Sequence, residues 1–158
     1  MRHDADEGCL ACELTSGKRT LPGGRIYETS LWVVEHTIGP LPAGTLILKP
    51  FRHCLSLAEL EPEESEQLGP LINLLSYTLT ELTRCDQVYC CLWSHAGWVP
   101  GHVHFVLQPA WNRQQDKHER PGPFAQVDMF SVGQEPDPQE VEEFARRARA
   151  FLDRIAGR

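Results

Sequence analysis

The sequence predicts an α+β domain in which about five strands form a sheet and a long helix packs on that sheet. Residues 102–108 alternate between polar and apolar side chains, which is the period of a half-buried strand. Residues 61–83 carry leucine and isoleucine at spacings of three and four, the stripe of an amphipathic helix. Short runs of apolar and branched residues precede that helix. Strands, then a helix, then a strand hairpin therefore follow one another along the chain.

Three strands are expected before the helix, at 25–28, 31–35 and 45–48. Thr29 and Ser30 make a tight connection between the first two, and the glycines and prolines of residues 39–44 predict a loop before the third. The third strand runs directly into the segment 49–54, which ends in His53 and Cys54.

The long helix is expected to begin at Glu61-Pro62, because proline and acidic residues suit a first helical turn, and to end near Thr83. Pro70 lies inside it and should either kink it or divide it. A fourth strand at 87–94 and the strand at 102–108 form the hairpin.

The end of the chain predicts one more helix. Residues 110–136 contain scattered prolines and glycines and are expected to be irregular. Asp137 is a suitable N-cap with Pro138 behind it, so a C-terminal helix should run from there to about Ala156.

Length and charge set the broad class. The 158 residues suit one domain, which we expect at 9–158, with a core of about 9–109, an extension at 110–158 and a flexible N-terminus at 1–8. A net charge of -7 argues against nucleic-acid polymers and anionic membranes as partners. The sequence has no signal-like or membrane-spanning apolar run, and six cysteines are too few for a disulfide framework, so we expect a cytoplasmic protein with reduced thiols.

Four residues have the chemistry of a metal site. Cys9 and Cys12 form a Cys-x-x-Cys pair, which is typical of half a metal site or of a redox motif, or represents two free structural cysteines. A polar tail precedes the pair where a redox motif would follow a buried strand, which favours metal. With His53 and His102 the set becomes two thiolates and two imidazoles, the ligands of a tetrahedral zinc ion. The long gaps exclude a zinc finger, and four protein ligands make the site closed and structural.

Taken together, these motifs resemble those of the histidine triad (HIT) superfamily. The resemblance covers Cys9-Leu10-Ala11-Cys12, the stretch 44–53, the long helix, and Val99-Pro100-Gly101-His102-Val103-His104-Phe105-Val106-Leu107-Gln108-Pro109. It implies an antiparallel sheet crossed by a helix, a homodimer, and chemistry at the α-phosphate of a nucleotide. The family motif, His-φ-His-φ-His-φ-φ with φ apolar, implies that His104 is the nucleophile.

The resemblance also bears on the metal and on substrate contacts. In zinc-bearing members similar to galactose-1-phosphate uridylyltransferase, the equivalent residues bind zinc, which implies a structural zinc at Cys9, Cys12, His53 and His102. The third motif histidine is replaced by Val106, which cannot donate a hydrogen bond. Gln108 lies on the same strand face about 7 Å further and is a poor substitute. His95 and Trp98 in the preceding loop are, with Gln108, the candidate substrate-binding residues.

Three functions follow from these observations. The first is a HIT-like nucleotide phosphate hydrolase or nucleotidyl transferase that forms a covalent nucleotidyl-histidine on His104. The alternative, favoured by Val106, is a catalytically weak or inactive nucleotide-binding or regulatory protein with a structural zinc. The third is a redox or metal-sensing protein that uses Cys9, Cys12 and Cys54. Lys49, Arg52 and His36 are expected to be ordinary surface residues.

Overall fold

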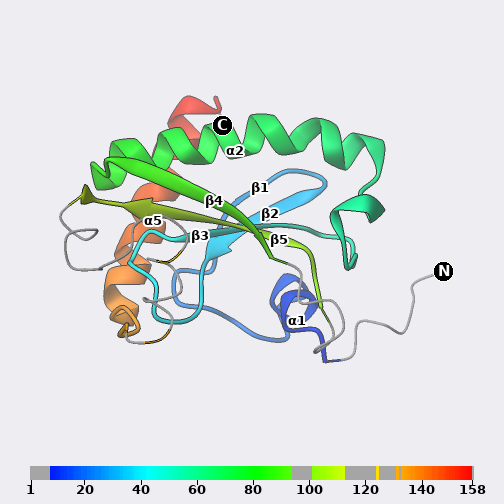
Figure 1. The fold of residues 1–158 in the computed structure, drawn as a ribbon, viewed down its shortest axis with the longest axis horizontal. Helices are drawn as coiled ribbons and strands as arrows, with labels where there is room; N and C mark the ends of the chain where they lie inside the picture. Colours follow the sequence, from blue (N-terminus) through cyan, green and yellow to red (C-terminus); the bar gives the residue numbers. More distant parts are fainter. Residues whose placement is uncertain (1–7, 94–100, 113–123, 125–130, 132, 158) are drawn as a thin grey trace.

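The computed structural model describes residues 8–93, 101–112, 124, 131 and 133–157, and within them the fold is α+β as predicted (Figure 1). The sheet is antiparallel throughout, in the order β1-β2-β3-β5-β4. Its strands are β1 (Arg25–Glu28), β2 (Trp32–His36), β3 (Leu46–Pro50), β4 (Gln87–Trp93) and β5 (His104–Ala110). The named helices are α1 (Leu10–Thr15), α2 (Pro62–Thr83) and α5 (Pro138–Ile155), with a short 3-10 turn at Leu57–Glu59.

One face of the sheet carries the hydrophobic core. Alternate residues of the strands point to this face, where they meet α2 and α5. The core set includes Trp32, Val34, Leu46, Leu48, Phe105 and Leu107 from the sheet, Leu71, Leu75 and Leu79 from α2, and Phe144, Ala145, Ala148 and Leu152 from α5. Figure 1 shows α2 along this side of the sheet and α1 on the other. The second face is therefore left for α1 and the candidate site.

Helix α2 begins as the sequence predicts and is not divided at Pro70. Glu61 and Glu64 form a capping box, each side chain bonding the backbone of the other, with Pro62 in the first turn. Pro70 lies inside the continuous 22-residue helix on its exposed side. Because the proline faces water, the carbonyl that loses its helical partner there can be hydrated.

The strand boundaries differ from the sequence prediction by one or two residues, and this changes the place of His102. Strand β5 begins at His104, so His102 precedes it and does not share a strand face with His104. The backbone N–H of Val103 donates to the carbonyl of Cys54 at 2.9 Å, which fastens this approach to the segment that leaves β3. Strand β2 extends to His36, one residue beyond the expected end.

The C-terminal helix α5 covers the core face of the sheet. Asp137 accepts a hydrogen bond from the backbone N–H of Gln139 at 2.7 Å, which is the predicted N-cap. Four apolar residues of α5 then enter the core beside β1, β2 and α2. Among the described helices, none has the length and apolar character needed to cross a membrane.

Candidate metal centre and active site

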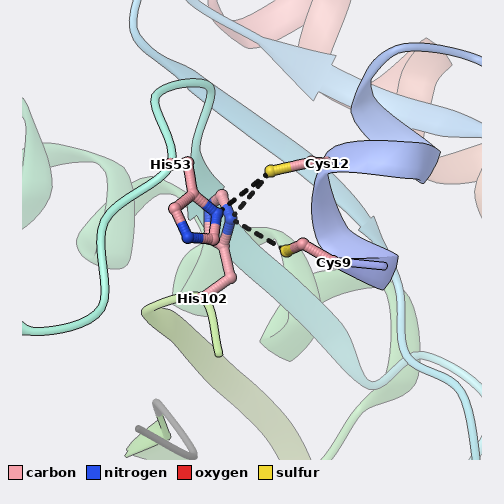
Figure 2. A group of neighbouring side chains, drawn as sticks. All are labelled: Cys9, Cys12, His53 and His102. Atoms are coloured by element: carbon pink, nitrogen blue, oxygen red, sulfur yellow. Dashed lines mark hydrogen bonds between the residues drawn. The ribbon is translucent and has the colours of Figure 1, made fainter. Parts of the chain in front are cut away.

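Two cysteines and two histidines from three separate segments meet beside α1 (Figure 2). Cys9 is the N-cap of α1 and Cys12 lies in its first turn, while His53 follows β3 and His102 precedes β5. Their ligand atoms all lie within 4.8 Å of one another. Two thiols and two imidazoles are the donor types that bind zinc in proteins.

The spacing of the donor atoms matches a tetrahedral centre. Cys12 Sγ lies 3.2 Å from His53 Nδ1 and 3.5 Å from His102 Nδ1, and Cys9 Sγ lies 3.7 Å from His102 Nδ1. A zinc ion with Zn–S of about 2.3 Å and Zn–N of about 2.0–2.1 Å would hold sulfur and nitrogen about 3.6 Å apart. The cluster is therefore already close to the size that a metal of this kind requires.

His102 is held in the tautomer that a metal ligand needs. Its Nε2–H donates to the carbonyl oxygen of Pro50 at 3.0 Å, which leaves the lone pair on Nδ1, the atom that faces the two thiols. Burial, and to a lesser extent the nearby charges of His53, Lys49 and His104, lower the pKa of His102 to about 4. The ring is thus neutral at pH 7 and able to coordinate.

His104 is oriented by the backbone of His102. It is the first residue of β5 and half-buried, and its Nδ1–H donates to the carbonyl oxygen of His102 at 2.8 Å. That donation places the remaining lone pair of the imidazole on Nε2. The side chain also lines a cavity of about 280 Å³ on the second face of the sheet. An imidazole nitrogen with nucleophilic character therefore borders a cavity of small-ligand size.

Helix α1 and the sheet form two walls of this open cavity. Its lining includes Leu10, Ala11 and Leu14 of α1, Glu35 of β2, and Ile47 and Lys49 of β3. Because α1 also carries Cys9 and Cys12, one short helix supplies both metal ligands and a wall of the cavity. The metal centre and the cavity are adjacent parts of one site.

Lys49 and Glu35 form a buried ion pair in this site, and the expectation that Lys49 is a surface residue is wrong. Lys49 Nζ lies 2.6 Å from Glu35 Oε2, and the two side chains are only 2% and 5% exposed. The ammonium also donates to the carbonyl oxygen of Ala11 at 3.2 Å. Covering of both sheet faces, by α2 and by α1, removes Lys49 from water. The sequence did contain an indication of this burial, because Lys49 and Glu35 are charged residues within otherwise apolar strands.

His36 is a second residue whose surface assignment is wrong. The side chain is 1% exposed, and its ring meets Phe144 of α5 edge-on at a centroid distance of 6.2 Å. Nδ1–H donates to the carbonyl of Thr37, and Nε2 accepts the backbone N–H of Gly44 at 2.9 Å. Burial lowers the pKa of His36. His36 therefore hydrogen-bonds to both ends of the β2–β3 connection and packs in the core.

Of the three residues predicted to contact substrate, the structure describes Gln108. Gln108 is 1% exposed on β5 and is not among the described residues that line the cavity. Val106 is 2% exposed and pairs with Ile47 of β3 and Cys91 of β4. His95 and Trp98 lie outside the described residues.

Cys54, which a redox or metal-sensing function would use, is buried, and burial raises the pKa of its thiol to about 11. A thiol of that pKa has little thiolate at neutral pH and is a poor redox group.

Comparison with solved structures identifies the fold. The chain matches no family model and no curated protein sequence. It is similar to a zinc-bound histidine triad family protein from Mycobacterium smegmatis, with 20% identity, 96% of this chain and 98% of that chain covered, and a TM-score of 0.69. A hypothetical histidine triad nucleotide-binding protein from Sulfolobus tokodaii gives 20% identity, 94% and 97% coverage and a TM-score of 0.69.

A third similar structure is that of an enzyme. Diadenosine triphosphate hydrolase from Plasmodium falciparum, solved in complex with cyclomarin A, gives 17% identity, 82% and 76% coverage and a TM-score of 0.59. These similarities show that the chain has the histidine triad fold, an α+β architecture built on a five-stranded antiparallel sheet.

Proposed function

We propose that the protein is a HIT-like nucleotide phosphate hydrolase or nucleotidyl transferase that acts at the α-phosphate through His104. The observation that carries the proposal is the hydrogen bond from His104 Nδ1–H to the carbonyl of His102, beside a cavity that His104 lines. This bond fixes the ring and leaves Nε2 as the attacking atom. Solved structures of the same fold include a hypothetical histidine triad nucleotide-binding protein and a diadenosine triphosphate hydrolase, which supports the substrate class.

The proposed reaction has two steps. His104 Nε2 attacks the α-phosphorus, a P–N bond forms, the P–O bond to the leaving group breaks, and the leaving oxygen departs with the electron pair and takes up a proton. Water or another acceptor hydroxyl then attacks the same phosphorus and loses its proton to solvent, the P–N bond breaks with its electron pair returning to Nε2, and the imidazole is regenerated. The carbonyl of His102 stabilises the positive charge that the ring acquires, because it accepts the Nδ1–H.

We further propose that Cys9, Cys12, His53 and His102 bind a structural zinc ion. The donor set and its spacing fit zinc, and one protein of the same fold is zinc-bound. With four protein ligands such an ion would supply rigidity and would take no part in the reaction itself. His102 would be anchored by its ring while its carbonyl orients His104, so the nucleophile is positioned before substrate arrives.

A specific observation favours the second candidate, a catalytically weak nucleotide-binding or regulatory protein. The HIT resemblance assigns Val106 to the position of the third motif histidine, and Val106 is packed in the sheet with no polar side-chain atom. Loss of one donor to a developing charge costs typically about 10²–10³ in rate. Under this alternative the cavity binds nucleotide and zinc keeps its structural role, but nucleotidyl transfer is slow or absent.

A rapid-quench experiment separates the two candidates. The protein and His104→Ala are incubated with adenosine and uridine nucleotides labelled at the α-phosphate, and the denatured protein is assayed for acid-labile label. Label on the original protein and none on His104→Ala is the expected result. No label and no turnover, together with nucleotide binding that survives in His104→Ala, would instead establish the binding protein. Tyr77→Phe, which changes an exposed residue of α2, is the control and should label normally.

The HIT resemblance also leads us to propose a cytoplasmic homodimer. Strand β4 forms an edge of the sheet and exposes Leu92 at 45%. An edge strand with exposed apolar residues is a liability unless it is covered. Light scattering should therefore give twice the mass of the chain, and a monomer at micromolar concentration would contradict the proposal.

A further inference from the structure

The Glu35–Lys49 pair presents unused hydrogen-bonding capacity to the cavity. Lys49 has three ammonium hydrogens, and within the described part of the chain its acceptors are Glu35 Oε2 and the carbonyl of Ala11. Glu35 Oε1 has no hydrogen-bond partner among the same residues. Both side chains line the cavity although they are almost fully buried. One donor and one acceptor are therefore available side by side.

A buried ion pair of this kind is a weak source of fold stability. Removing two charges from water is costly, and well-packed apolar residues at such positions are often as stable or more stable. The neighbouring lining residues Leu10, Leu14 and Ile47 are apolar, so apolar side chains suit this environment. A charged pair in an otherwise apolar cavity can make ligand binding selective, because a ligand that cannot hydrogen-bond to the pair leaves its charges unsatisfied.

The position of the pair relative to His104 suits the base of a nucleotide. Glu35 on β2 pairs with Ile47 on β3, which pairs with Val106 on β5, so Glu35 lies two strand spacings across the sheet and two residues along it from His104, about 12 Å in all. Lys49 lies on β3 between them. A nucleotide with its phosphate at His104 would have its base at about this distance, between the apolar side chains of α1 and the ion pair on the sheet.

We propose that the Glu35–Lys49 pair selects the base of the substrate, and that the selected base carries a lactam edge, an N–H next to a carbonyl, as in guanine and uracil. The inference rests on the proposed function. The ammonium can only donate and the ionised carboxylate can only accept, so the carbonyl oxygen pairs with Lys49 and the ring N–H with Glu35. Adenine and cytosine also offer an acceptor and a donor, a ring nitrogen and an amino group, but this acceptor is less polar and this donor less acidic, so their hydrogen bonds to the charged pair are weaker.

The test compares binding of GMP, UMP, AMP and CMP to the zinc-bound protein and to the double variant Glu35→Met/Lys49→Met. A good pair of base contacts gives about tenfold discrimination or more. GMP and UMP should therefore bind the original protein at least about tenfold more tightly than AMP and CMP. In the double variant the four affinities should fall within about threefold of one another, with unchanged zinc content. The exposed pair Glu143 and Arg146, changed to Met in the same way, is the matched control and should keep the original preference.

A second measurement needs no variant. Monophosphates of 1-methylguanosine and 3-methyluridine lack the lactam N–H and should bind the original protein about tenfold more weakly than GMP and UMP. A preference for AMP or CMP, equal affinity for methylated and unmethylated bases, or a double variant that keeps the original preference would overturn the inference while leaving the proposed function intact. Failure of the protein to bind any of the four nucleotides would refute the proposed function itself.

Discussion

Replacing Cys12 by serine removes one of the four donors and should separate α1 from the rest of the fold. The hydrophobic core is built by the sheet, α2 and α5, and α1 contributes no member to it. A six-residue helix is also too short to be stable alone. With free zinc at a thousand times its Kd, the ion stabilises the folded state by about 4.1 kcal/mol. For a domain of this size each kcal/mol shifts the Tm by about 2–4 °C, so the loss is about 8–16 °C.

The assay combines zinc content by atomic absorption with thermal unfolding followed by circular dichroism. The original protein should hold about one zinc per chain and lose about 8–16 °C of Tm on chelation, while far-UV ellipticity at 20 °C stays close to its original value. Cys12→Ser should resemble the chelated protein. Cys90→Ser, at an exposed position on β4, is the control and should bind zinc normally. Stoichiometric zinc in Cys12→Ser, or zinc loss in Cys90→Ser, would refute the assignment of the ligands.

Two further substitutions test the packing against α5, on the core face of the sheet. A Cβ at Gly23 would lie 2.5 Å from the Cβ of Ala145, whereas one at Gly17 meets nothing within 4 Å, and both glycines have φ near +78° (77° and 79°). Gly23→Ala should therefore be about 1–3 kcal/mol less stable than Gly17→Ala in urea unfolding, and equal stabilities would contradict the close contact. Burial lowers the pKa of His36 in the folded state below 6.5, so the stability that the neutral ring contributes is fully present above pH 6.5. As the pH decreases towards the folded pKa, this contribution to the free energy of unfolding falls by at most about 1.4 kcal/mol per pH unit. His36→Gln, which can still accept from Gly44, should show a smaller loss of stability between pH 7.5 and 5.5, and an identical loss would assign the acid sensitivity to other groups.

The strands and long helices were predictable because their hydrophobic periods are local. The leucine stripe of α2 and the capping residues of α5 each lie within one segment, and the structure confirms both helices. Helix α1 was not predicted as a helix. Its six residues hold no hydrophobic period, and contacts with distant segments, such as that of Cys12 with His53, fix its position. Boundaries such as the start of β5 depend on strand pairing, which local patterns do not encode.

Those site residues that their side-chain chemistry alone distinguishes could be predicted from the sequence. Those that meet only through strand pairing could not. Thiols and imidazoles are few in the chain, so Cys9, Cys12, His53 and His102 were recognisable as a set although they span 94 positions, and the structure brings them together. The partner of Lys49 was not recognisable. Glu35 and Lys49 meet only because β2 and β3 pair in one register, with Val33 opposite Lys49 and Glu35 opposite Ile47, while α1 excludes water from above.

The bonding of His102 determines how the two parts of the site should be tested. Its Nδ1 faces the thiols, its Nε2–H binds the carbonyl of Pro50, and its own carbonyl orients His104. A substitution of His102 would therefore disturb metal binding and the nucleophile at once and distinguish neither.

Cys12→Ser and His104→Ala separate the two roles. If zinc only positions the nucleophile, Cys12→Ser should still label on His104 but more slowly, by about 10²-fold for a displacement of about 1 Å. Peptide mapping of the labelled protein checks this. An undiminished labelling rate in zinc-free Cys12→Ser would show that the hydrogen bond to the His102 carbonyl forms without the metal, and that the metal centre serves α1 alone.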